Sequence, residues 1–150
     1  MRLTEHFTLE ELTVTQVRDV DNDPDPQELD NLRALAGALE GVRRALDHLP
    51  ILISSGYRSP EVNRRVGGSQ SSAHMQGLAA DFICPSFGTP YECCVAIEDL
   101  VRDFDQLIHE YGRWVHFAIA APGTQGRRQR LTIFTAAEGY LPGIRKRGVI

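Results

Sequence analysis

Apolar side chains recur with the period of an amphipathic helix across residues 26–47. Leucine or valine occupies one helical face, at Leu29, Leu32, Leu35, Leu39, Val42 and Leu46. This spacing predicts a long helix whose apolar stripe packs against the core. Asp25 before Pro26, with Glu28 following, is the pattern of an N-cap, a first-turn proline and a capping box. We therefore expect the longest helix to run from Pro26 to about Asp47.

Similar start signals predict three shorter helices. Thr8 and Glu11 form a capping-box pattern near the N-terminus, and Thr89 and Glu92 repeat it before an apolar stretch that ends near residue 101. Ser59 followed by a proline predicts a short helix to about residue 66. The Gly- and Ser-rich residues 67–72 predict a flexible loop.

Short apolar runs rich in branched and aromatic side chains predict five strands. They are Ile51–Ser55, expected to be buried, and then Leu78–Ile83, Asp105–Glu110, Trp114–Ile119 and Leu131–Thr135. The turn at 111–113 joins the third and fourth runs as a hairpin. Helices and strands mixed in this way predict an α+β fold with a small, largely antiparallel sheet flanked by helices. We expect one domain over residues 1–150.

Composition excludes several classes of protein. With 42% hydrophobic and 24% charged residues in 150, the chain is typical of a globular protein with its own core. A formal net charge of -4 argues against general nucleic-acid binding. No apolar run approaches the ~20 residues of a membrane helix, and the N-terminus lacks the apolar core of a signal peptide. We expect a monomer that is synthesised in the cytoplasm without a signal peptide.

The three cysteines, Cys84, Cys93 and Cys94, do not form a disulfide pattern. Their number is odd and two of them are adjacent in the chain. We interpret them as reduced, half-buried side chains that pack as small hydrophobic groups.

Candidate chemistry lies at three separated polar positions. Asp81 interrupts the apolar run L-A-A-D-F-I, and His116 interrupts W-V-H-F-A-I. A carboxylate in such a strand must be paired or bound to a metal, because burial of an unpaired charge is costly. His74 follows the flexible loop. Two histidines and one carboxylate are the ligands of an open catalytic zinc site, although these residues alone do not exclude manganese or iron.

Three ordered motifs resemble the zinc D-Ala-D-Ala peptidase family, which includes bacterial DD-carboxypeptidases and phage endolysins. They are S-G-Y-R-S at residues 55–59, S-x-H-x-x-G-x-A-x-D at 72–81 and W-V-H at 114–116. The similarity is greatest to the compact phage-type branch and extends from about residue 7 to 134. It implies the fold shared with the Hedgehog signalling domain. It also implies one Zn²⁺ per chain, bound by His74, Asp81 and His116.

The resemblance also implies roles for residues around the metal. Arg58 would stabilise the oxyanion or bind a substrate carboxylate. Trp114 would contact substrate. Ser72 would either contact substrate or orient the site. Many family members carry an acidic residue three positions before the last histidine, but Arg113 stands there. Glu110, six positions before, matches Hedgehog-like members and is our candidate general base.

His109, beside Glu110, has three possible roles. It is a spare ligand, a proton carrier or a core histidine, and we favour the core histidine because strand alternation turns it to the other face of the sheet.

The implied activity is hydrolysis of a peptide bond in peptidoglycan stem peptides. The enzyme would be a carboxypeptidase that cuts the D-Ala-D-Ala bond or an endopeptidase that cuts a bond of the L-Ala-D-Glu type. A zinc-containing module that binds peptidoglycan or a protein without cutting it is the alternative, as is a phage structural component with a vestigial site. Without a signal peptide, we expect the chain to reach the bacterial cell wall after release through a holin-type pore or in a phage particle.

Overall fold

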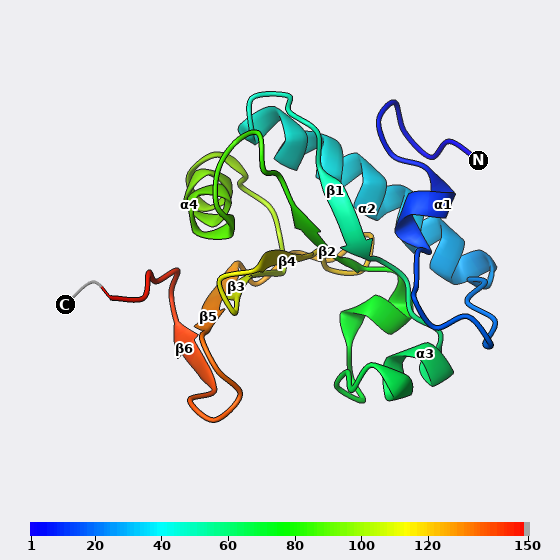
Figure 1. The fold of residues 1–150 in the computed structure, drawn as a ribbon. Coiled ribbons are helices and arrows are strands. Elements are labelled where there is room, and N and C mark those ends of the chain that lie inside the picture. The colour runs from blue at the N-terminus through cyan, green and yellow to red at the C-terminus, as the bar shows by residue number, and fades with distance from the viewer. Residues whose placement is uncertain (149–150) are drawn as a thin grey trace.

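The computed structural model describes residues 1–148. Helices predominate in the first part of the chain, and the last four elements are strands (Figure 1). Their order is α1 Leu9–Leu12, α2 Pro26–Ala45, β1 Leu52–Ser55, α3 Pro60–Arg65, the 3₁₀ helix η1 Ala73–Gln76, β2 Ala79–Ile83, α4 Pro90–Leu100, β3 Gln106–Glu110, β4 Trp114–Ala118, β5 Gln129–Ile133 and β6 Tyr140–Pro142. The α+β prediction is confirmed, and none of the helices described has the length and apolarity of a membrane span.

The capping signals place the helix starts correctly. The capping boxes predicted at Thr8, Asp25 and Thr89 all form, each with its two reciprocal bonds. Helix α2 ends slightly before the predicted position, because Asp47 and His48 adopt φ angles of 60° and 59°, which a right-handed helix does not accommodate.

All strands belong to one six-stranded sheet with the order β1-β2-β4-β3-β5-β6. The pairing is antiparallel except between β3 and β5, which run parallel. The prediction of a largely antiparallel sheet therefore needs a correction, because the sheet is mixed. Residues 119–128 carry the chain from β4 past β3, so β5 starts at the same end of the sheet as β3. A sequence pattern of strands does not reveal which neighbour a returning strand will choose.

Two details of the sheet differ from expectation. The first predicted strand is not buried, because β1 lies at the edge of the sheet and Leu52 is 52% exposed. Strand β6 was not predicted, since its three residues, Tyr140–Pro142, carry a proline and lack apolar alternation. Helix η1 was also missed, and it begins directly after the predicted flexible loop.

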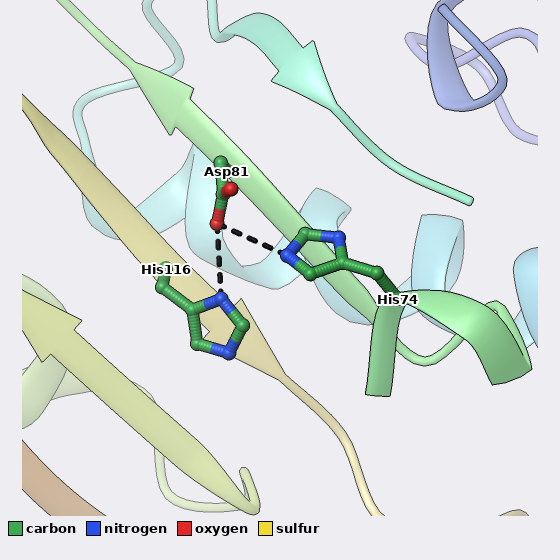
Figure 2. A group of neighbouring side chains, drawn as sticks. All are labelled: His74, Asp81 and His116. Carbon is green, nitrogen blue, oxygen red and sulfur yellow. Dashed lines mark hydrogen bonds and ion pairs between the residues drawn. The ribbon is translucent and has the colours of Figure 1, made fainter. Parts of the chain in front are cut away.

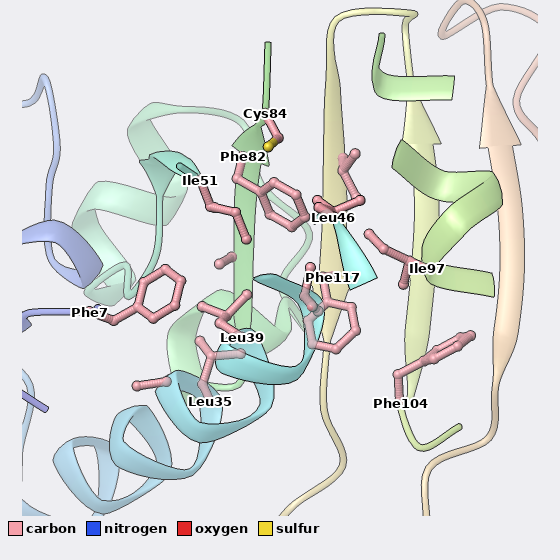
Figure 3. Close-up of a cluster of buried hydrophobic side chains, with 14 of the residues drawn as sticks. Phe7, Leu35, Leu39, Leu46, Ile51, Phe82, Cys84, Ile97, Phe104 and Phe117 are labelled. Carbon is pink, nitrogen blue, oxygen red and sulfur yellow. The ribbon is translucent and has the colours of Figure 1, made fainter. Parts of the chain in front are cut away.

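The apolar core lies between one face of the sheet and the two longest helices. Helices α2 and α4 cover this face, whereas α3 and η1 lie on the other side (Figure 1). Phe82 and Phe117 from the sheet pack with Leu39 of α2 and Ile97 of α4 (Figure 3). The three cysteines are free and fully buried within this core, not half-buried as expected. The second face of the sheet therefore remains available for polar side chains.

Candidate metal centre

Helix η1 fixes the first of the three predicted metal ligands. Ser72 is the N-cap of η1, and its Oγ accepts a hydrogen bond from the backbone N–H of His74 at 3.2 Å. Gly77 ends the helix with a φ of 74°, and a Cβ there would lie 2.7 Å from the carbonyl oxygen of Glu28. Helix α2 thus packs closely against η1, which only glycine allows. Ser72 therefore caps the helix that carries His74, and its predicted role in orienting the site stays a prediction.

The sheet fixes the other two ligands. Asp81 and His116 are direct cross-strand partners in β2 and β4, so their side chains project from the same face. Asp81 Oδ1 lies 2.9 Å from His116 Nδ1 and 3.3 Å from His74 Nε2 (Figure 2). All three residues are buried, and their potential ligand atoms lie within 4.8 Å of one another. Residues that are far apart in the sequence thus converge on one point.

The hydrogen bonds of His74 show that this point suits a cation. Its Nδ1 lies 2.8 Å from the carbonyl oxygen of Gly56, which can only accept, so Nδ1 carries the proton. Nε2 then presents a lone pair toward the carboxylate of Asp81. Two facing lone pairs repel each other unless a cation lies between them. Two imidazoles and a carboxylate, with one imidazole oriented by a carbonyl, fit zinc with one position open for water.

Electrostatics within the triad agree with this donor set. Burial alone would raise the pKa of Asp81, but the imidazoles of His74 and His116 hold it well below its usual range. Burial likewise opposes protonation of His116, but its hydrogen bond to Asp81 and the nearby carboxylate of Glu110 raise its pKa. The site thus combines a firmly ionised carboxylate with imidazoles that bind a proton or a metal.

The predicted general base lies beside this triad. Glu110 is the last residue of β3 and pairs with Trp114 across the hairpin. Its Oε1 lies 3.7 Å from His116 Nδ1, and its side chain is 14% exposed. Burial, followed by the negative charge of Asp81, raises the pKa of Glu110. Trp114 Nε1 is buried and has no hydrogen-bond partner within residues 1–148.

Arg58 contacts the metal triad from the other side. Its Nη2 lies 3.3 Å from Asp81 Oδ2, and its Nε donates to the hydroxyl of Ser55 at 3.0 Å. Its Nη1 lies 3.4 Å from Asn63 Oδ1. These contacts use three of the five guanidinium N–H groups. Arg58 therefore stabilises the orientation of a metal ligand and still has donors to spare.

Comparison with known proteins agrees with the motif. A family model described as Peptidase M15 matches residues 5–118. The chain belongs to the peptidase M15 family. A zinc D-Ala-D-Ala carboxypeptidase of Streptomyces albus G is 42% identical to it over 50 residues, which are 33% of this chain and 20% of that protein. The resemblance stated from the motifs is thus confirmed, and the chain aligns with only a fifth of that relative's length.

Asn22 is one residue of this M15 site that the sequence did not reveal. Its Nδ2 donates to the carbonyl oxygens of Thr13 and Tyr57, both at 3.0 Å, and its Oδ1 accepts from the N–H of Ser59 at 2.7 Å. Asn22 therefore holds the peptide groups on both sides of Arg58. Its sequence context indicates only an Asp-rich loop, since its contacts to Tyr57 and Ser59 span more than 30 residues.

Asn63 has a related role on the other side of Arg58. It is buried on α3, accepts the contact from Arg58 and donates to the carbonyl oxygen of Ser69 at 2.9 Å. A Cβ at Gly68 would lie 2.0 Å from Asn63 Oδ1, so glycine is required there. A polar residue on the buried face of a short helix, before Gly67 and Gly68, was the signal available in the sequence.

His109 lies apart from the M15 site. It projects from the opposite face of β3, where its Nδ1 donates to the carbonyl oxygen of Arg145 at 3.0 Å. Its ring packs edge-on against Tyr91 and Phe134. The favoured interpretation of His109 as a core histidine therefore agrees with its position. Arg113, at the position of the missing acidic residue, is exposed in the hairpin turn.

Proposed function

We propose that this M15 chain is a zinc metallopeptidase that hydrolyses a peptide bond in peptidoglycan stem peptides. The position of Glu110 carries the proposal. A buried carboxyl with a raised pKa lies 3.7 Å from a ring nitrogen of His116, on the face that holds the triad. Groups with these properties serve as general bases near neutral pH. All of these residues come from one chain, so we expect the monomer to be active.

The chemistry divides between the metal and the chain. Zinc, when bound, lowers the pKa of a coordinated water and polarises a carbonyl. Glu110 accepts a proton from the attacking water and donates it to the leaving amine nitrogen. Asp81 stays ionised throughout, because the guanidinium of Arg58 lies beside its carboxylate and a bound zinc ion would add further positive charge there.

Arg58 and Trp114 supply the contacts to substrate. The two N–H groups of Arg58 that have no hydrogen-bond partner in residues 1–148 are suited to a developing oxyanion or to a substrate carboxylate. Trp114 Nε1 is buried without a partner, and buried donors are normally paired. The indole also counteracts the rise that burial causes in the pKa of Glu110, so Trp114 lies beside the candidate base. We therefore assign Trp114 to substrate binding, whereas Ser72 acts through His74.

The choice of peptidoglycan is supported by the family and by the relative's name. The relative is a carboxypeptidase for D-Ala-D-Ala, and the segment it shares with this chain is 50 residues long. We propose two alternatives for the bond, the terminal D-Ala-D-Ala bond or an internal bond such as L-Ala-D-Glu. We further propose that the chain acts at the bacterial cell wall, after release from the cell or as part of a phage particle.

Digestion of purified peptidoglycan tests this function. The protein is incubated with sacculi, with and without a chelator, and the released fragments are identified by mass spectrometry. We expect release that the chelator abolishes and added zinc restores, and the fragment masses identify the bond. Stoichiometric zinc without any release from several wall types would contradict the proposal. Retention of that protein on insoluble wall would then support a binding module.

A further inference from the structure

A single row of side chains crosses the metal face of the sheet. Glu110 pairs with Trp114 of β4 on one side and with Ile133 of β5 on the other. Ile133 in turn pairs with Tyr140 of β6. Directly paired residues project from the same face, so all four belong to one row. Two strand spacings, about 10 Å in total, separate the backbone of Tyr140 from that of Glu110.

The position of Tyr140 in this row is not explained by the core. The Tyr140 side chain is 56% exposed, whereas its cross-strand partner Ile133 is 4% exposed. Within residues 1–148 its hydroxyl has no hydrogen-bond partner. Leu141, the next residue, pairs with Thr132 and therefore faces the opposite side of the sheet. β6 thus turns one apolar residue toward the core side and presents an aromatic ring beside the metal face.

The charges of the metal centre reach the Tyr140 hydroxyl. Partial burial raises its pKa, and the carboxylates of Glu110 and, more weakly, Asp81 raise it further. The hydroxyl therefore lies within the field of both site carboxylates. Tyr111 contributes in the same direction, and its ring packs on Trp114 with the centroids 5.4 Å apart. Three aromatic side chains thus surround the Glu110 end of the site.

The hairpin that carries Tyr140 lies outside the matched family segment. The family match ends at residue 118, and β5 and β6 follow it. The hairpin projects toward the same side of the sheet as α3, away from α2 and α4 (Figure 1). It therefore borders the metal face opposite the elements that hold Arg58 and His74.

We propose that Tyr140 binds the stem peptide on the Glu110 side of the metal centre and helps to determine which peptide the chain accepts. This inference rests on the proposed function. A tyrosine ring packs against a peptide over a large area at a low cost in conformational entropy, and its hydroxyl hydrogen-bonds to the peptide backbone. Trp114, in the same row, provides the second aromatic contact.

The inference is tested by measuring how tightly a peptide binds to a variant that cannot cleave it. The zinc-loaded Glu110→Gln protein is titrated with a synthetic stem pentapeptide that ends in D-Ala-D-Ala, and Kd is measured by calorimetry. Adding Tyr140→Ala should weaken binding about tenfold or more while zinc content stays unchanged. Leu100→Ala, at a residue that is 60% exposed on α4, is the matched control and should leave Kd unchanged.

Tyr140→Phe separates the ring from the hydroxyl. Binding close to that of the parent protein assigns the contact to the ring, and a loss equal to that of Tyr140→Ala assigns it to the hydroxyl. A Kd for Tyr140→Ala within about twofold of the parent overturns the inference. If the parent binds too weakly to titrate, KM for cleavage by the otherwise wild-type chain is compared instead, with the same criterion.

The proposed function and this inference fail in different ways. Binding that depends on Tyr140, in a chain that never cleaves the peptide, overturns the proposed hydrolysis and leaves the inference standing. Cleavage of the peptide with a KM that Tyr140→Ala leaves unchanged supports the proposed hydrolysis and overturns the inference about Tyr140. A chain that neither binds nor cleaves the pentapeptide overturns both.

Discussion

The two faces of the sheet each bury a histidine, and the two rings have opposite character. His109 faces the helices, where burial lowers its pKa and a carbonyl fixes its proton on Nδ1. His116, one strand away, faces Asp81 and Glu110, and their carboxylates raise its pKa. Burial is similar in both places, at 3% and 8% exposed. The partner therefore decides whether a buried histidine is a neutral packing residue or a ligand for a cation.

The surroundings of each histidine reinforce this difference. The His109 face is lined by large apolar groups such as Phe117 and Leu107, and all three thiols lie there. The His116 face carries small residues, Ala79 and Ala118, beside the charged ones. Large side chains thus fill the core on one face, whereas small buried residues adjoin the charged groups on the other.

Replacement of the same residue type on the two faces should separate their functions most strongly. His116→Gln removes a direct metal ligand. Loss of a residue that only supports a ligand typically lowers metal affinity 10- to 100-fold, so we expect a larger fall in zinc affinity here, of roughly 1,000-fold. Titration with a competing zinc chelator measures this. Zinc binding at wild-type affinity would contradict the assignment of His116.

His109→Gln is the matched control. It should leave zinc affinity and fragment release unchanged and reduce the free energy of unfolding by about 1–3 kcal/mol, because ring packing and a buried hydrogen bond are lost. Urea unfolding measures the stability. Loss of zinc from this variant would show that the two faces are not independent.

Glu110→Gln should separate chemistry from metal binding on the His116 face. The amide cannot accept the proton, so turnover should fall by about 100- to 10,000-fold while zinc content remains at one per chain. Rates of fragment release and metal analysis on the same preparation provide the two readouts. Turnover at the wild-type rate would mean that another group is the base.

The pH dependence of zinc affinity should sharpen the contrast between the two histidines. The protonated ring of His116 cannot bind zinc, so affinity should fall about tenfold per unit as pH decreases below its raised pKa. In the zinc-free protein, the free energy of unfolding should depend on pH in the opposite direction. The stability from His116⁺ is fully present below about pH 6.5 and is lost as pH rises through the folded-state pKa. Zinc titrations over a pH series should give the same slope for His109→Gln.

Asn22→Ala should have the smallest effect on chemistry. The peptide groups beside Arg58 lose their partner, so turnover should fall about tenfold through misplacement of the guanidinium, and about 1–3 kcal/mol of stability should be lost. Zinc affinity should remain unchanged. Asp23→Ala, at an exposed position in the same loop, should behave as wild type. Equal turnover in both variants would remove Asn22 from the site.

Local signals predicted much of this architecture. Capping boxes fixed the starts of three helices, because a capping box depends on residues only three positions apart. The three candidate ligands, which the structure brings together, were predicted because two polar residues interrupt apolar strands and the third belongs to an ordered motif. Strand alternation was enough to place His109 and His116 on opposite faces.

Features that depend on long-range contacts could not be predicted in this way. The parallel pairing of β3 with β5 results from the path of residues 119–128, which has no periodic pattern. Asn22 acts through bonds to backbone groups 35 and 37 residues away. Tyr140 became visible only when the register aligned it with Glu110.

X-ray absorption at the zinc edge of the zinc-loaded chain tests the central claim most directly, that the His116 face holds the metal. His74, Asp81 and His116 predict a shell of nitrogen and oxygen ligands at about 2.0–2.2 Å, with scattering from two imidazole rings and no sulfur. Sulfur scattering at about 2.3 Å would place zinc on the buried thiols of the opposite face and contradict the account.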